Sequence, residues 1–144
     1  MTQQHLFATP TEELIVCTDG GARGNPGPAA IGVSICNADG DELDAIAQTI
    51  GETTNNVAEY SAVVIGLQRA AELGARAVEV RSDSMLLVEQ LNGRYKVRKP
   101  HLQALVRDVR AAAAPFERVR YKHVPRAANA RADELVNQAL DAEA

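Results

Sequence analysis

Residues 14–28 of this chain read LIVCTDGGARGNPGP, an apolar run that ends in one carboxylate and passes directly into a glycine-rich turn. The apolar part is typical of a central strand that is buried on both faces. An isolated buried carboxylate is costly, so Asp19 needs a partner or a cation. The glycines would let a bulky group such as a phosphate or a ribose approach the backbone. Asp19 is therefore a candidate site residue, although a strand-end Asp that opens an Asx-type turn explains the pattern equally well.

Length and composition limit the class of protein. A chain of 144 residues with 46% hydrophobic and 24% charged residues fits one globular domain. The net charge of −4 argues against a protein that coats nucleic acid by bulk charge, but it allows a site where divalent metals neutralise carboxylates. We find no signal-peptide pattern and no apolar stretch of about 18 residues or more, so we expect a cytoplasmic protein.

The spacing of apolar residues predicts an α/β protein. Apolar side chains alternate in residues 31–35, and Asp39-Gly40 marks a hairpin turn, so the chain opens with three antiparallel strands. The predicted strands lie near residues 13–19, 31–35, 42–50, 76–82 and 116–124, and the predicted helices near 54–73, 83–91, 101–113 and from 129 to the C-terminus. The order βββαβααβα implies a five-stranded mixed sheet flanked by helices. We expect residues 1–12 to be a flexible segment and residues 13–142 to form a single domain.

Glu59 is a second carboxylate that the pattern leaves unexplained. In a helix its same-face neighbours are Ala62, Val63 and Gly66, which are all apolar or small. A glutamate on the packing face of a helix is costly unless something pairs with it. The alternative is a glutamate at the edge of that face, whose carboxylate reaches water.

Asp83 and Asp133 stand where an ordinary structural role is available. Asp83 follows a predicted strand and could cap the next helix together with its serine neighbours. Asp133 lies in the first turns of the last helix, where acidic residues suit the helix dipole and Asn129 is the expected cap. However, the C-terminal ends of adjacent parallel strands open onto one edge of a sheet. Asp19 and Asp83 would then lie side by side, with Glu59 approaching from the helix that packs across the sheet.

Four carboxylates that converge without a basic partner repel one another, and some of them would remain protonated. Divalent cations resolve this conflict, and hard oxygen ligands suit Mg²⁺ or Mn²⁺. Two such ions roughly 3.5–4 Å apart activate a water and stabilise the leaving oxygen in phosphodiester hydrolysis. If the four acids meet, metal-assisted chemistry is the function that they indicate.

Four stretches of the sequence, in this order, resemble the ribonuclease H type 1 family. They are TDGGARGNPGP (residues 18–28), TTNNVAEY (53–60), SDS (82–84) and NARADEL (129–135). Four ordered motifs over nearly the whole chain are more specific than any one of them. The resemblance implies a ribonuclease H-like fold and a metal-dependent endonuclease that hydrolyses the RNA strand of RNA–DNA hybrids, leaving 5′-phosphate and 3′-hydroxyl ends.

The resemblance also assigns roles to individual residues. It implies two Mg²⁺ or Mn²⁺ ions held by Asp19, Glu59, Asp83 and Asp133, with Asp19 bridging both. Glycine backbone and asparagine side chains would lie along the hybrid, since amides can recognise 2′-hydroxyl groups. The residues expected to contact the substrate are Gly20, Gly21, Arg23, Asn25, Thr54, Asn55, Asn56, Ser84, Arg94, Lys96, Arg126 and Asn129.

The chain departs from the family pattern at three places. Arg126 takes the position of a loop histidine that many members carry, and an arginine does not titrate near neutral pH. The basic, Trp-bearing protrusion of well-known bacterial members is replaced by a short basic loop, residues 93–100, without Trp. Glu52 stands where a phosphate-contacting arginine is common. The last two changes predict weaker and more salt-sensitive binding of the hybrid.

Two other functions stay open at this point. One is a module of the same fold that binds a hybrid or structured RNA without cutting it. The other is a nucleotide-binding α/β protein, which the spacing of Gly21, Gly24 and Gly27 disfavours because it is not a Gly-x-Gly-x-x-Gly pattern. We expect a monomer that acts on an RNA–DNA hybrid and has no membrane partner. The last helix ends without a clear stop signal, which allows that the chain is one domain of a longer protein.

Overall fold

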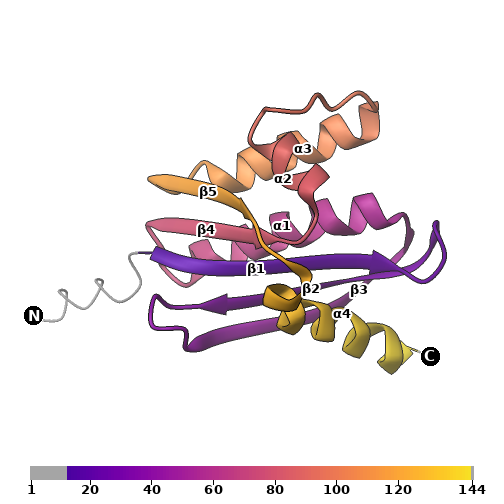
Figure 1. Cartoon of the computed structure of the whole chain (residues 1–144), viewed down its shortest axis with the longest axis horizontal. Coiled ribbons are helices and arrows are strands. Elements are labelled where there is room, and N and C mark those ends of the chain that lie inside the picture. Colours follow the sequence, from indigo (N-terminus) through magenta and orange to yellow (C-terminus); the bar gives the residue numbers. More distant parts are fainter. Residues whose placement is uncertain (1–12, 144) are drawn as a thin grey trace, which may run out of the picture.

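The computed structural model describes residues 13–143, which form a five-stranded mixed sheet in the order β3-β2-β1-β4-β5 with helices on both faces (Figure 1). The strands are β1 (Glu13–Ala22), β2 (Gly27–Cys36), β3 (Glu42–Thr53), β4 (Ala77–Ser82) and β5 (Arg118–His123). The helices are α1 (Asn55–Glu72), α2 (Met85–Leu91), α3 (Pro100–Ala113) and α4 (Ala130–Glu143), with a short 3₁₀ helix, η2 (Arg126–Asn129). The predicted element order and mixed sheet are confirmed. The flexible segment predicted for residues 1–12 lies outside the described residues.

The pairing of β1 decides which side chains meet at the edge of the sheet. β1 runs antiparallel to β2 and parallel to β4, and the parallel register pairs Cys17 with Arg81. Two residues further on, the same register puts Asp19 beside Asp83. β4 pairs in turn with β5, again in parallel. The structure therefore confirms that the ends of the first and fourth strands lie side by side.

Helices cover the two faces of the sheet unequally. α1 and α3 pack together on one face, and α1 contacts β1 and β2 over the main core, in which Val16, Val63 and Leu67 are fully buried. α4 lies on the other face against β1, β2 and β3, over a small cluster that includes Ala30 and Val136 (Figure 1). Across residues 13–143, no helix is both long and apolar enough to cross a membrane.

The first two glycines after Asp19, Gly20 and Gly21, have different surroundings in the structure. Both belong to β1, which continues through Ala22, so the strand is longer than predicted. A Cβ on Gly20 would lie 2.3 Å from the carbonyl oxygen of Ala58 in α1, and this glycine is therefore required for α1 to pack on the strand. A Cβ on Gly21 would meet nothing closer than 3.9 Å. The side-chain position of Gly20 is thus filled by α1 and that of Gly21 is open, while contact of either backbone with a ligand stays a prediction.

A third glycine lets α4 approach the sheet, and its replacement provides a test of that packing. A Cβ on Gly32 of β2 would lie 2.2 Å from the Ala132 carbonyl oxygen and 2.9 Å from the Leu135 Cβ. We expect Gly32→Ala to lower the free energy of unfolding by about 1–3 kcal/mol or more, because backbone must shift to relieve the overlap. Urea denaturation followed by circular dichroism measures this. Gly21→Ala is the matched control, and equal stability of the two variants would contradict the close packing of α4.

Candidate active site

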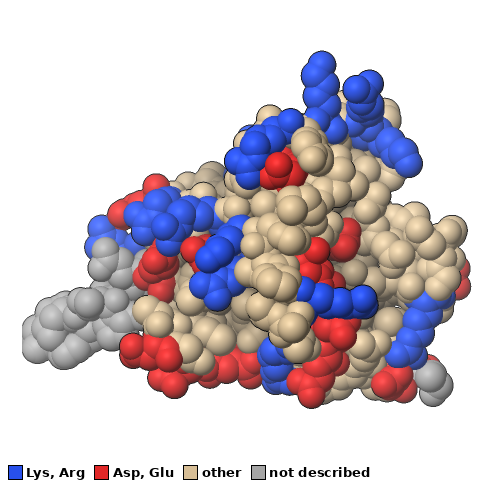
Figure 2. Space-filling model, in the orientation of Figure 1, with Lys and Arg blue, Asp and Glu red and all other residues tan. Residues whose placement is uncertain are grey.

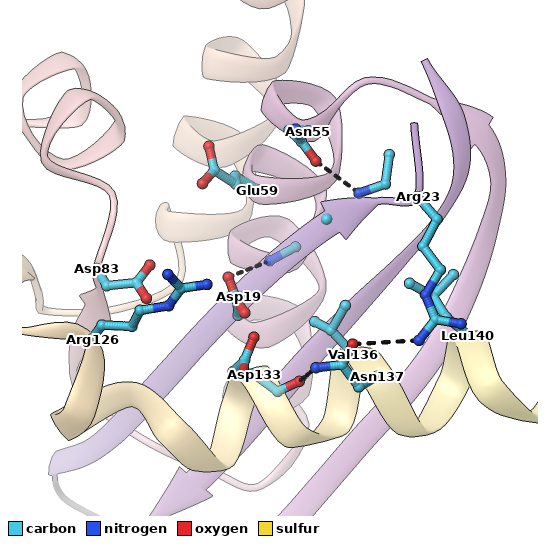
Figure 3. A pocket seen from close by; sticks show the side chains of 13 residues that line it. Asp19, Arg23, Asn55, Glu59, Asp83, Arg126, Asp133, Val136, Asn137 and Leu140 are labelled. Carbon is cyan, nitrogen blue, oxygen red and sulfur yellow. Dashed lines mark hydrogen bonds between the residues drawn. The ribbon is translucent and has the colours of Figure 1, made fainter. Parts of the chain in front are cut away.

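The four acids singled out in the sequence line one cavity of about 400 Å³ at the edge of the sheet (Figure 3). Each comes from a different element: Asp19 from β1, Glu59 from α1, Asp83 from the residue after β4, and Asp133 from the first turn of α4. Five of the predicted substrate-contact residues line the same cavity. They are Gly20, Gly21, Arg23, Asn55 and Arg126.

Hydrogen bonds fix the ends of the two strands that carry aspartates. The hydroxyl of Thr18 donates to the Arg81 carbonyl oxygen at 3.3 Å, which ties β1 to β4 directly below Asp19 and Asp83. The Ser82 hydroxyl accepts from the Ser84 backbone N–H at 3.0 Å and turns the chain sharply after β4. Asp83 lies in this turn and not in α2, contrary to the predicted start of that helix.

Glu59 reaches the cavity because α1 begins close to β1. Thr54 caps the helix, with its hydroxyl accepting from the Val57 N–H at 3.3 Å. The absent side chain of Gly20 then lets the backbone around Glu59 approach the strand, since a Cβ there would lie 2.6 Å from the Glu59 nitrogen. A hydrogen bond with the side chain of Ser84, the cap of α2, acts on the Glu59 carboxylate and lowers its pKa.

Asn129 holds the start of α4 against β1. Its side chain is 1% exposed, and its Nδ2 donates to the Thr18 carbonyl oxygen at 2.9 Å. Its Oδ1 is buried and has no hydrogen-bond partner within residues 13–143. The cap that we expected from Asn129 is thus replaced by a bond across the fold. Because Asp133 follows one turn later, this bond sets the distance between Asp133 and Asp19.

Burial and mutual repulsion raise the pKa of two of the acids. The pKa of Asp19 rises to about 7, chiefly through burial and then through the nearby Asp83 and Asp133, against a hydrogen bond from the Gly20 N–H. The pKa of Glu59 also rises to about 7, through burial and then through Asp83. Arg126 lines the cavity but forms no ion pair within the described part of the chain. At neutral pH the cluster therefore favours either bound protons or a cation.

The donor set fits a hard divalent cation. It consists of carboxylates only, which is the ligand chemistry that Mg²⁺ and Mn²⁺ prefer. Between residues 13 and 143 no three acidic, histidine or cysteine side chains already form a ligand group for one ion. Binding therefore requires the carboxylates to turn toward the ion from the positions that they hold here.

The glycine turn is tied to the N-terminus of α1 by two asparagines. Asn55 accepts from the Ala22 N–H at 2.8 Å through its Oδ1, and Asn25 accepts from the Asn55 N–H at 3.0 Å in the same way. The turn itself closes with a bond from the Arg23 N–H to the Pro28 carbonyl oxygen at 2.8 Å. Both Oδ1 atoms are used within the protein, so the Nδ2 groups are the donors that a ligand would meet.

Two residues that sequence reasoning missed hold Arg23 at the rim of the cavity. The Arg23 guanidinium donates to Asp141 at 2.6 Å. It also donates to the Asn137 Oδ1 at 3.4 Å (Figure 3). Asn137 also donates to the Asp133 carbonyl oxygen at 3.1 Å. The signal was present in the sequence, because Asn137 and Asp141 follow Asp133 at four-residue intervals and so share its helix face.

Seven predicted contact residues do not line the cavity. They are Asn25, Thr54, Asn56, Ser84, Arg94, Lys96 and Asn129. Arg94 is ion-paired with Glu89 of α2 at 2.6 Å, whereas Lys96 is exposed. The loop that carries both is anchored from within, because the buried Tyr60 hydroxyl donates to Gln90, which itself donates to the Lys96 carbonyl oxygen at 3.5 Å.

Comparison with known proteins places this chain in a family. A family profile described as reverse transcriptase-like matches residues 17–139. Ribonuclease HI of Halobacterium salinarum is 43% identical over 123 residues, 85% of this chain and 62% of that protein. The crystal structure of RNase H1 from that archaeon has a TM-score of 0.88 at 41% identity and covers 90% of this chain and 98% of that one.

Two further relatives extend the likeness. Bifunctional protein Rv2228c of Mycobacterium tuberculosis is 47% identical over 92% of this chain, which spans only 36% of that longer protein. LC11-RNase H1, solved in complex with an RNA/DNA hybrid, has a TM-score of 0.86 at 45% identity, covering 90% of this chain and 98% of that one. With this likeness and with its four acids gathered at one edge of the sheet, the chain belongs to the ribonuclease H type 1 family.

Proposed function

We propose that this protein is a metal-dependent endonuclease that hydrolyses the RNA strand of RNA–DNA hybrids and leaves 5′-phosphate and 3′-hydroxyl ends. The observation that carries the proposal is the convergence of Asp19, Glu59, Asp83 and Asp133 on one cavity. The relatives named ribonuclease H1, one of them solved with an RNA/DNA hybrid, support the choice of substrate. Within the proposal, residues 13–142 act as one catalytic domain, as a monomer or as part of a longer chain.

The four carboxylates would hold two Mg²⁺ or Mn²⁺ ions. Asp19 lies between Asp83 and Asp133 in the cavity, which suits a carboxylate shared by both ions (Figure 3). When bound, such ions activate a water and stabilise the leaving oxygen of the phosphodiester. The residues around them keep the acids in place, through Ser84 on Glu59 and Asn129 below Asp133.

The floor of the cavity would recognise the RNA strand. Gly21 leaves its backbone open, and the Nδ2 groups of Asn25 and Asn55 can donate to 2′-hydroxyl groups, which both donate and accept. Gly20 would complete the floor, and Arg23 would contact the strand from the rim. Asn25, Asn56, Thr54 and Ser84 lie outside the cavity lining and would contact the hybrid beside it. These contacts follow the RNA strand, because only RNA offers the 2′-hydroxyl.

Charged side chains around the cavity would bind phosphates. Arg126 is exposed, lacks an ion-pair partner among the described residues, and extends its guanidinium into the cavity beside Asp83 (Figure 3). An arginine there can form a bidentate contact with a phosphate. It stays protonated near neutral pH, so it does not transfer protons. Lys96 is exposed and would contact the hybrid directly, whereas Arg94 would first have to leave Glu89. Asn129 would act indirectly, by holding Asp133.

Replacing the shared carboxylate tests the mechanism. We expect Asp19→Asn to lower the rate of hybrid cleavage in Mg²⁺ by roughly 100-fold or more, because a neutral amide is a poor ligand for a hard cation. Circular dichroism should show an unchanged fold. Asp108→Asn, the same chemical change at an exposed position of α3, is the control. Near wild-type cleavage by Asp19→Asn would rule out the proposed role of this residue.

A substrate panel tests the proposed activity against the non-cleaving alternative. We expect cleavage of an RNA–DNA hybrid in Mg²⁺ or Mn²⁺, none of double-stranded DNA, which lacks 2′-hydroxyl groups, and none of any substrate in EDTA. Labelled double-stranded RNA and a duplex with a single ribonucleotide show how far the specificity extends. Tight binding of the hybrid with no product in either metal would instead identify a binding module.

The raised pKa values predict an unusual dependence of stability on pH. In the folded state the pKa values of Asp19 and Glu59 are about 7, whereas in the unfolded chain they return to their ordinary values of 3.8 and 4.5. Without metal, stability should therefore fall as the pH rises from about 4 to about 7, because folding takes up protons in this range. Asp19→Asn should flatten this fall and raise the stability at pH 8 by on the order of 1–2 kcal/mol, discounted for the water that reaches the carboxylate.

Thermal unfolding at several pH values, with EDTA or with Mg²⁺, measures this effect. Mg²⁺ should raise the melting temperature of the wild type more at pH 8 than at pH 5, because at pH 5 protons compete for the same carboxylates. The control is again Asp108→Asn. A wild type that becomes more stable between pH 4 and pH 7 in EDTA would show that these carboxylates are not held against one another as described.

A further inference from the structure

Half of one sheet face has no helix over it among the described residues. α1, α2 and α3 lie over one face, but α4 lies only over β1–β3 on the other (Figure 1). The side chains on this open half can be assigned from the core, because Val78 and Val80 of β4 and Val119 and Tyr121 of β5 point toward α1 and α3. Their neighbours in sequence must face the open side.

The open half carries a row of cations, which we call the basic strip. Its members are Arg81 of β4 and Arg118, Arg120 and Lys122 of β5. The three from β5 are all exposed and repeat every second residue, or about 6.6 Å along the strand. Arg81 is the direct ladder neighbour of Lys122. Lys and Arg side chains are visible over this part of the surface (Figure 2).

Two carboxylates lie among these cations but do not neutralise them. Glu13 pairs with Arg118 at 3.2 Å and with Arg120 at 2.9 Å. Glu79, only 13% exposed, pairs with Arg81 at 2.6 Å and with Arg120 at 3.3 Å. Three arginines thus share two carboxylates, in a chain whose net charge is −4. Lys122 has no ion-pair partner within residues 13–143. The pairs orient the arginine heads and leave an excess of positive charge.

The basic strip is continuous with the active site. Asp19 is two residues after Cys17, and Cys17 is the ladder neighbour of Arg81, so the catalytic aspartates and the strip share one face of the sheet. The chain passes from Lys122 at the end of β5 to Arg126 at the cavity within four residues. A strand that leaves the cavity on this side would meet Arg126, then Lys122, Arg120 and Arg118 in turn.

We propose that the basic strip binds single-stranded RNA that extends beyond the hybrid held in the active site. The proposal rests on the proposed function, because it is the cavity that would hold the rest of the same RNA. An extended strand with one phosphate per nucleotide matches a row of regularly spaced cations, whereas the core of a protein interface is depleted of charged residues. The strip gives the enzyme a means to distinguish a hybrid inside a longer RNA from an isolated one.

Binding measurements with matched substrates test this. The probes are a short blunt RNA–DNA hybrid and the same hybrid with a single-stranded RNA extension at its 5′ or its 3′ end. The protein carries Asp19→Asn in Mg²⁺ so that the probe is cut too slowly to affect the measurement, and fluorescence anisotropy gives the ratio of the two Kd values. The strip variant is Arg118→Gln/Lys122→Gln. The control, Arg107→Gln/Arg110→Gln, removes the same charge from exposed positions of α3.

We expect the extension, at one of the two ends, to tighten binding by roughly threefold or more in the parent protein. The strip variant should lose most of this gain. For the extended probe, the slope of the logarithm of the binding constant against the logarithm of the salt concentration should become shallower by about 1.4. This is about 0.7 for each of the two contacts to single-strand phosphates that the variant removes. The α3 control should keep the gain.

Three results would overturn the proposal: no gain from an extension at either end, an equal gain in the strip variant, or an equal loss in the α3 control. Cleavage of the blunt hybrid by the wild-type protein is measured separately, so the proposed function stands or falls on a different result.

Discussion

The parallel pairing of β1 with β4 is the constraint on which the site depends. Only a parallel pair brings two C-terminal strand ends to the same edge, and the register that joins Cys17 to Arg81 sets Asp19 beside Asp83. Glu59 and Asp133 are then placed relative to this pair. α1 reaches β1 through the space left at Gly20, and α4 is fastened to Thr18 by Asn129. A slip of the register by one residue would turn the two aspartates to opposite faces.

The four carboxylates concentrate negative charge at one edge of the sheet, where this charge does not stabilise the fold. The pKa values of Asp19 and Glu59 rise to about 7 because the surrounding structure keeps the carboxylates close and partly dry. A core of aliphatic side chains, fully buried at Leu14, Val16 and Val63, supplies the stability that makes this tolerable. Function and stability thus oppose each other at this edge, and divalent ions would relieve the conflict.

Sequence alone was sufficient for the parts of the molecule that depend on local patterns. The element order, the mixed sheet and the four acids followed from periodicity and ordered motifs, because strand alternation and helix spacing are properties of neighbouring residues. It failed where distant segments touch. Nothing near Gly20 in sequence reveals that Ala58 fills its free side, and nothing near Asn129 reveals that its amide reaches Thr18 instead of capping α4. The anchoring of Arg23 by Asp141 joins residues more than a hundred positions apart.

The contrast between Gly20 and Gly21 bears on how variation in this family is interpreted. The two neighbours share one motif, so an invariant pair would be assigned to substrate recognition as a unit. Yet Gly20 is held by the helix behind it, and selection would keep it even in a descendant that had lost all nuclease activity. Gly21 faces open space, and its side of the strand is free to change once no nucleic acid lies there. Substitution of Gly21 with Gly20 unchanged would therefore mark relatives that keep the fold but have lost the nuclease activity.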